Sequence, residues 1–357
     1  MERKPATTAP VKDLALSQSG DTVILTFTLP KETLTRHPLK EPPAIEIFRN
    51  FSPAPPGPTA ATPPSAQLIV TIPPELVAQY SPQGRFRYAD SLTAEDLSRH
   101  AGNEAVYFVR TRLSSKRASE NSNLSSVRVY LVPEPIADLQ AEVTHSAVVL
   151  KWTPPQKSLV GPAPPIANYE IFRQAEEPAP APTVAAPPPG EKPKSKPAPA
   201  KIGESAEPSF RDTQFEFGKT YIYTVRSIIQ IPDGTRASAD SNAVVVSPKD
   251  IFPPSAPQGL VIVFVAANAQ VPAHLELSWA INPETDIAGY NVYRSEQEGT
   301  RGERLNSALL LTPAFRDMTA LPGRRYFYSV TAVDTAGNES AAGAPASAGI
   351  PGENPAP

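Results

Sequence analysis

The residues of this chain with types and spacing suited to chemistry are two groups of oxygen-bearing side chains. Glu284 and Asp286 lie in one segment, and Asp334 and Asn338 lie in a later one. Carboxylate and amide oxygens are ligands of Ca²⁺, which takes about six to eight of them. Asp and Asn also hydrogen-bond their own backbone in turns, and Ala336-Gly337-Asn338 is an ordinary turn sequence. We favour the turn explanation and predict no metal or other cofactor, with Ca²⁺ binding by these four residues as the alternative.

No pattern typical of an enzyme active site accompanies these groups. The sequence has no nucleophile elbow, no glycine-rich phosphate loop and no zinc signature. Its four histidines are scattered, with no pair at metal-ligand spacing: His37, His100, His145 and His274. We therefore predict no catalytic residues and a non-enzymatic function.

The composition narrows the possible partners and folds. The chain of 357 residues has no cysteine, so neither disulfides nor thiolate metal sites can form. Its net charge is -3, and no run of Lys and Arg forms a basic stripe, which argues against nucleic acid. The longest apolar stretch, residues 260–267, is too short for a transmembrane segment, and residues 1–5 show no export signal within this chain.

One strand-like phrase occurs three times: IEIFR at 45–49, YEIFR at 169–173 and YNVYR at 290–294. The spacing is far above the period of solenoid repeats, about 20–50 residues, so it predicts whole domains in tandem. The same arginine ends each phrase. These arginines could form a periodic surface for anions, but we favour charges that keep a strand edge from pairing with other chains.

Each repeat carries the alternation of half-buried strands. Val148, Leu150 and Trp152 share one face of a predicted strand, and Leu277 and Trp279 do the same later in the chain. Several short strands of this kind, separated by turn signals, predict an all-β sandwich.

Residues 133–350 resemble fibronectin type III domains. Trp152 and Trp279 match the family's buried tryptophan, and the pattern G-x-x-Y-x-Y-x-V recurs at 218–225 and 323–330. The resemblance implies immunoglobulin-like sandwiches. By the same match, Tyr221 and Tyr326 are the tyrosine-corner residues, whose hydroxyls bond to upstream backbone. The phrases DIFPP at 250–254 and AVDTAGNES at 332–340 are similar to bacterial members, many of which are exported or lipid-anchored at the envelope.

Residues 11–132 match less well and are interpreted as a divergent module. Phe27 stands where the tryptophan is expected, and Ala105 stands where the tyrosine corner is expected. Residues 93–97 instead form a capping-box pattern that predicts a short helix. A different sandwich topology is possible for this module.

The predicted fold is therefore three tandem all-β sandwiches with proline-rich loop insertions. Because the family's strand order brings the loops at 282–286 and 334–339 to one end of the third sandwich, the resemblance also implies that the four candidate Ca²⁺ ligands approach one another. The predicted segments are a disordered N-terminus at 1–10, domains at 11–132, 133–248 and 249–350, and a disordered tail at 351–357.

The insertions follow the repeated phrase in the first two domains, at 50–65 and 174–209. Their Pro- and Ala-rich composition predicts polyproline-like or disordered chain. They could dock into an aromatic groove, but a tolerated surface insertion is the explanation we favour.

The function that fits best is a non-enzymatic scaffold or spacer outside the cytoplasm, contacting a protein or a cell-envelope polymer. We expect a monomer with no nucleic-acid partner, located in the extracellular space, the periplasm or the envelope. The alternatives are a carbohydrate- or protein-binding adhesion module and an accessory region of a larger secreted enzyme. A binding module would need exposed aromatic residues, for which Tyr80, Phe86 and Tyr88 are the candidates.

Overall fold

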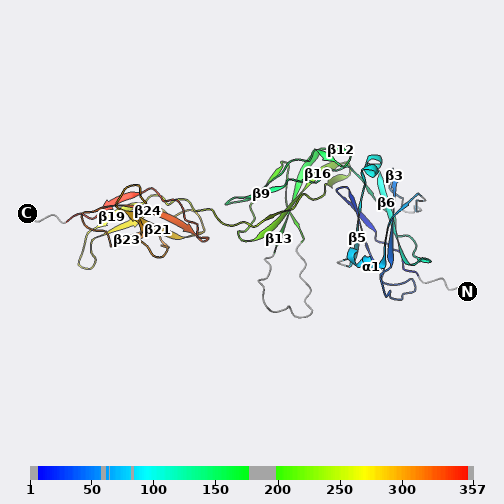
Figure 1. Ribbon diagram of the computed structural model, residues 1–357, viewed down its shortest axis with the longest axis horizontal. Helices are drawn as coiled ribbons and strands as arrows, with labels where there is room; N and C mark the ends of the chain where they lie inside the picture. Colours follow the sequence, from blue (N-terminus) through cyan, green and yellow to red (C-terminus); the bar gives the residue numbers. More distant parts are fainter. Residues whose placement is uncertain (1–6, 58–61, 64, 82–83, 177–197, 353–357) are drawn as a thin grey trace, which may run out of the picture. The chain divides into compact units, whose positions relative to one another are not determined.

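The computed structural model describes residues 7–57, 62–63, 65–81, 84–176 and 198–352 (Figure 1). The chain divides into two units, residues 1–248 and 249–357. The first unit holds two β-sandwiches with separate hydrophobic cores, and the second unit holds one.

The first sandwich packs a three-stranded sheet, in the order β1-β2-β5, against a sheet in the order β4-β3-β6-β7, with β8 also paired to β6. Its strands are β1 (Ala15–Ser19), β2 (Thr22–Thr28), β3 (Ala44–Ser52), β4 (Gln67–Ile72), β5 (Arg85–Ser91), β6 (Glu104–Ser114), β7 (Arg117–Ala118) and β8 (Ser125–Arg128). The helices are α1 (Pro74–Val77), the 3-10 turn η1 (Ala78–Tyr80) and α2 (Ala94–His100).

The second sandwich repeats this order as β9-β10-β15 and β14-β13-β16-β17, with β18 also paired to β16. Its strands are β9 (Gln140–Val143), β10 (Val148–Lys151), β13 (Ile166–Glu176), β14 (Ala200–Ser205), β15 (Ser209–Asp212), β16 (Thr220–Ile231), β17 (Gly234–Ala237) and β18 (Val244–Val246). A two-stranded ribbon of β11 (Lys157–Ser158) and β12 (Gly161–Pro162) precedes β13.

The third sandwich has the sheets β19-β20-β23 and β22-β21-β24-β25. Its strands are β19 (Val261–Val265), β20 (His274–Ser278), β21 (Ile287–Ser295), β22 (Glu303–Arg304), β23 (Ala314–Asp317), β24 (Arg325–Asp334) and β25 (Ala346–Gly349). All three sandwiches are therefore immunoglobulin-like and antiparallel, as the sequence predicts. The first keeps the strand order of the other two despite its divergent sequence.

Alternating side chains build the three cores. In the second sandwich Val148 and Leu150 are fully buried, and Trp152 meets Tyr169 edge to face at 5.1 Å between ring centroids. Trp279 makes the equivalent contact in the third sandwich at 5.4 Å. Phe27 takes the place of the tryptophan in the first sandwich, where the ring of Phe86, from the neighbouring strand, lies 4.6 Å away. The smaller ring is thus compensated by a second aromatic ring in the same layer.

The first two sandwiches also meet each other within the first unit. Val132, Ile229 and Ile231 form a small buried cluster beside the joint between them. The backbone N–H of Gly20 donates to the carbonyl of Ala237 at 3.1 Å. These contacts restrict the joint beyond what its prolines alone would do.

The structure corrects three expected segment boundaries. Thr8 is 1% exposed and bridges to Thr33, so the described residues at 7–10 are part of the first sandwich rather than a disordered segment. The predicted insertion at 174–209 is too long, because β13 runs to its third residue and β14 and β15 occupy its C-terminal part. Strand β3 likewise extends into the insertion predicted at 50–65. The remaining parts of the predicted N-terminal segment, loops and C-terminal tail at 1–6, 58–61, 64, 177–197 and 353–357 lie outside the described residues.

Candidate functional site

Three aspartates meet at one end of the third sandwich. Asp250 precedes its first strand, Asp286 precedes β21, and Asp334 ends β24. One carboxylate oxygen from each lies within 4.8 Å of the other two. Asp334 is 2% exposed, whereas Asp286 faces solvent. The sequence predicted the approach of Asp286 and Asp334 and missed Asp250, which lies in the joint that precedes the sandwich.

The other two predicted ligands have different positions. Asn338 donates its backbone N–H and its side-chain amide to Asp334, both at 2.8 Å, so it holds that carboxylate in place. Glu284 is outside the group of three. It accepts from the backbone N–H of Ser255 at 2.7 Å and from the amide of Asn282 at 3.1 Å. Hydrogen bonds from Ser255 lower the pKa of Glu284 to about 2.

The three aspartates have the chemistry of a cation site as well as that of a turn. None of them forms an ion pair with Lys or Arg in the part of the chain that the structure describes. Three like charges at this spacing repel one another, and a divalent cation would relieve the repulsion. They could supply carboxylate ligands to Ca²⁺, with water completing the shell. The bonds from Asn338 are equally what a turn requires, so Ca²⁺ binding stays a prediction.

A second arrangement occurs in all three sandwiches and joins their sheets. The arginine that ends the repeated phrase binds an aspartate of the opposite sheet, and a tyrosine hydroxyl donates to the same carboxylate oxygen. The groups are Arg49–Asp90–Tyr107, Arg173–Asp212–Tyr223 and Arg294–Asp317–Tyr328, with ion-pair distances of 2.8, 2.7 and 2.9 Å.

These ion pairs overturn the interpretation of the arginines as strand-edge charges. The arginine side chains are only 12%, 20% and 12% exposed, and the aspartates are more buried still. Removing one partner of a buried pair leaves the other charge unpaired, which typically costs about 3–5 kcal/mol. The repeated arginine therefore serves the internal structure of each sandwich.

The tyrosine-corner positions lie beside these groups. Tyr221 accepts the backbone N–H of Glu216 at 3.0 Å, and Tyr326 accepts that of Leu321 at 3.4 Å. The guanidinium of Arg173 stands 4.9 Å from the centre of the Tyr221 ring, and Arg294 makes the same contact at 4.8 Å. Ala105 leaves this place without a ring in the first sandwich.

Helix α2 lies in the connection between β5 and β6, where the other two sandwiches have the backbone N–H that bonds to the tyrosine. Thr93 caps the helix by accepting from the backbone of Asp96, whose side chain accepts in return from the N–H of Thr93, as the capping box predicts. Arg49 also binds Asp96, at 3.0 Å, so the helix is tied to the end of β3. The ring of His100 stacks on Phe51 with 4.1 Å between centroids and 7° between planes.

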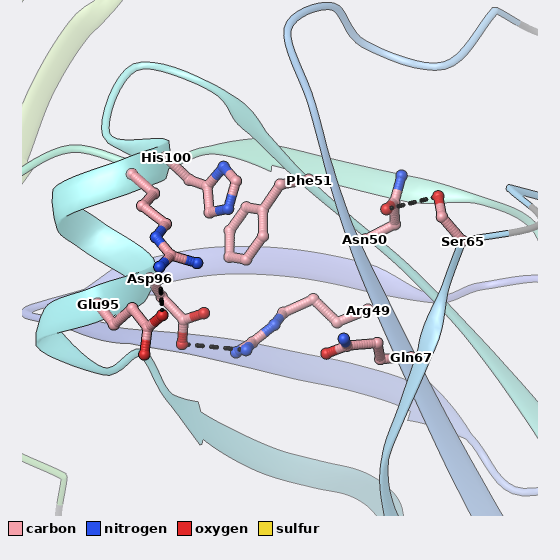
Figure 2. Close-up of a pocket in the computed structure, with 9 residues that line it drawn as sticks. Arg49, Asn50, Phe51, Ser65, Gln67, Glu95, Asp96 and His100 are labelled. Atoms are coloured by element: carbon pink, nitrogen blue, oxygen red, sulfur yellow. Dashed lines mark hydrogen bonds and ion pairs between the residues drawn. The ribbon is translucent and has the colours of Figure 1, made fainter.

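A pocket of about 370 Å³ lies between this helix and the ends of β3 and β4, and we call it the β3–α2 pocket. Figure 2 shows the Phe51 and His100 rings facing each other, and Asn50, Ser65 and Gln67 across from the helix. Arg49, Glu95, Asp96 and Arg99 complete its lining. Its volume is within the usual range of ligand pockets, about 300–1,000 Å³.

The aromatic residues suggested for a binding face lie elsewhere. Phe86 is fully buried, and Tyr80 and Tyr88 pack against the core of the first sandwich. Arginine alternates with Phe86 and Tyr88 at 85–88, and this pattern already indicates that the two aromatic side chains lie on the face of the strand that points into the core. The sequence also contains a pattern that marks two of the ion-pair aspartates, because Phe-Arg-Asp occurs at both 210–212 and 315–317. No sequence pattern marks the β3–α2 pocket, since its walls come from three separate segments.

Comparison with known proteins finds partial similarity to three enzymes. The chain is 30% identical over 209 residues to exoglucanase B of Cellulomonas fimi, a match that covers 56% of this chain and 15% of that protein. It is 37% identical over 93 residues to amylopullulanases of Thermoanaerobacterium thermosulfurigenes and Thermoanaerobacterium saccharolyticum, covering 26% of this chain and 4% and 6% of those proteins. The chain thus corresponds to a small part of each relative.

No protein-family model matches the chain. Among the residues that the structure describes, no helix is both long enough and apolar enough to cross a membrane.

Proposed function

We propose that this chain is a non-catalytic accessory region of a larger secreted enzyme that acts on a polysaccharide. The observation that carries the proposal is the match to exoglucanase B, which takes in more than half of this chain but 15% of that protein. The amylopullulanase matches are also confined to small parts of long enzymes. Short matches within long enzymes are what we expect of an accessory module that different enzymes carry in addition to their catalytic parts.

We further propose that the three sandwiches are fibronectin type III modules. Their common strand order supports this, as do the aromatic contacts of Trp152 and Trp279. The bonds accepted by Tyr221 and Tyr326 fit the tyrosine corner of that family.

The physical role that we propose is to hold other domains of the enzyme at a distance from one another while contacting its substrate or the cell envelope. Three separate cores, each with its own inter-sheet ion pair, support a role as a row of individually stabilised spacer modules. The expected setting is outside the cytoplasm, with a protein or an envelope polymer as partner. The sandwich fold alone does not select the partner, because it hosts many functions.

An immunoblot of the source organism tests the proposal. An antibody raised against this chain should detect, in the culture fluid or at the cell surface, a polypeptide much larger than the 38.2 kDa of this chain. The same band should clear a polysaccharide in a zymogram. Detection of a 38.2 kDa species alone, inside the cell and without such activity, would overturn the proposal.

A further inference from the structure

We propose that the β3–α2 pocket of the first sandwich binds a sugar ring of a neutral polysaccharide. The inference rests on the proposed function for the choice of polysaccharide, and on the pocket itself for the chemistry. The pocket forms where the first sandwich departs from the other two, because helix α2 replaces the tyrosine corner in the connection between β5 and β6.

The charges in the pocket are already neutralised. Arg49 is bound to Asp90 and Asp96, and Arg99 is bound to Glu95 at 2.8 Å. The lining thus holds two arginines against the carboxylates of Glu95 and Asp96. An anionic ligand would have to break one of these pairs, and a cationic ligand would meet the arginines. The pocket therefore suits an uncharged ligand.

Its remaining polar groups are free to serve such a ligand. The side-chain amide of Gln67 and the ring nitrogens of His100 have no hydrogen-bond partner within the described residues. Asn50 accepts from Ser65 through its carbonyl oxygen at 3.1 Å, which leaves its amide nitrogen available as a donor. An amide both donates and accepts, and a neutral imidazole does the same.

The Phe51–His100 stack adds an apolar surface beside these groups. A sugar hydroxyl is both donor and acceptor, and the C–H faces and edges of a pyranose ring are apolar. One ring presents several hydroxyls to the amides and C–H groups to the aromatic edges at the same time. A purely apolar ligand would leave the amides of Asn50 and Gln67 unpaired, which is unfavourable.

The third sandwich offers an internal comparison. A hollow at the related place beside Arg294 is lined by Glu296, Glu303 and Tyr326, where Glu303 is paired with Arg294 and Glu296 with Arg324. The guanidinium of Arg294 lies 4.8 Å from the centre of the Tyr326 ring, and that of Arg49 lies 5.1 Å from the centre of the Phe51 ring, so the arginine contact is common to both hollows. This hollow has no stacked ring pair among its lining residues, and we expect no sugar binding there.

Affinity electrophoresis of the full chain tests the inference. Native gels containing pullulan, barley β-glucan, xylan or galactomannan serve as probes, and at least one should retard the protein. The variants Gln67→Ala and His100→Ala should each weaken the apparent affinity about threefold to tenfold, the usual effect of losing one hydrogen bond. The control Gln297→Ala, in the hollow of the third sandwich, should migrate like the unaltered chain.

Two results would overturn the inference. One is the absence of retardation by all four polysaccharides. The other is retardation that both pocket variants retain in full, which would place sugar binding elsewhere on the chain. Neither result affects the immunoblot and zymogram, so failure of the pocket and failure of the accessory role are distinguishable.

Discussion

The substitution Tyr328→Phe measures how much the hydrogen bond from Tyr328 to Asp317, which joins the two sheets, contributes to the stability of the third sandwich. The hydroxyl of Tyr328 donates to Asp317 at 2.7 Å, and the Asp317 side chain is 1% exposed. A hydrogen bond to a charged group contributes about 1.5–3 kcal/mol. Arg294 and Thr319 continue to bind Asp317, so the carboxylate keeps partners. We therefore expect the free energy of unfolding of the third sandwich to fall by about 2 kcal/mol.

Tryptophan fluorescence can isolate that sandwich within the full chain. The chain has two tryptophans, Trp152 in the second sandwich and Trp279 in the third. In a Trp152→Phe background, emission during urea titration reports the third sandwich alone. The matched control is Tyr326→Phe, which also deletes one hydroxyl from a buried tyrosine. Its bond, accepted from Leu321 at 3.4 Å, joins neutral groups and should contribute less, about 0.5–1 kcal/mol.

The pH dependence provides an independent test. Burial acts to raise the pKa of Asp317, but bonds from Tyr328 and Thr319 and the charge of Arg294 outweigh it and lower the pKa. A lowered pKa in the folded state gives stability that is present above the unfolded value, about 3.9, and lost as pH falls through the folded value. The difference between Tyr328→Phe and the parent should therefore shrink in acid. An effect equal to that of Tyr326→Phe, or one unchanged between pH 7 and 2, would refute the reasoning.

Three further perturbations test other contacts. In the presence of a chelator, Asp286→Asn should raise the thermal midpoint of unfolding slightly, because it removes repulsion among the three aspartates. The same variant should abolish any increase in the midpoint that millimolar CaCl₂ produces in the parent. No increase in the midpoint of the parent with CaCl₂ would exclude the Ca²⁺ site. Hydrogen bonds from Thr331 and Tyr293 lower the pKa of Glu339 to about 2 against the effect of burial. The stabilisation by Glu339 is thus lost as pH falls from about 4.5 towards 2. Glu339→Gln should therefore make the free energy of unfolding of the third sandwich less dependent on pH in that range. An unaltered acid transition would count against these bonds. Gly20 has φ +58, and a Cβ there would lie 2.9 Å from the backbone nitrogen of Ala239. Gly20→Val should speed proteolysis between the first two sandwiches at least severalfold, and an unchanged cleavage rate would show that this contact does not order the joint.

Local patterns in the sequence were sufficient to predict the three sandwiches. Alternation places Val148, Leu150 and Trp152 on one face regardless of distant residues, because the side-chain period of a strand is two. The capping box that begins α2 is equally local, since Thr93 and Asp96 bond each other within one turn. Features of this kind survive even where the first module loses its tryptophan.

The boundaries of the loops were less predictable. Composition alone suggested long insertions after the repeated phrase, yet strand β3 extends into the first of these segments and strand β14 forms within the second. An edge strand gains its backbone hydrogen bonds from the neighbouring strand, so its existence depends on a partner far away in sequence. Phe86 illustrates the same limit, because its burial depends on the sheet that covers it.

What the sequence by itself determined is therefore the class of fold, the number of sandwiches and the residues that fill their cores. What only the tertiary structure decided is which charged and polar side chains from distant parts of the sequence contact one another. Arg49 meets Asp90 from the opposite sheet, and Asp250 meets Asp286 and Asp334 from outside the strands. The β3–α2 pocket likewise joins a strand end, a loop and a helix. Periodicity specifies which way each side chain points, but the packing of one sheet on the other determines which distant side chain it reaches.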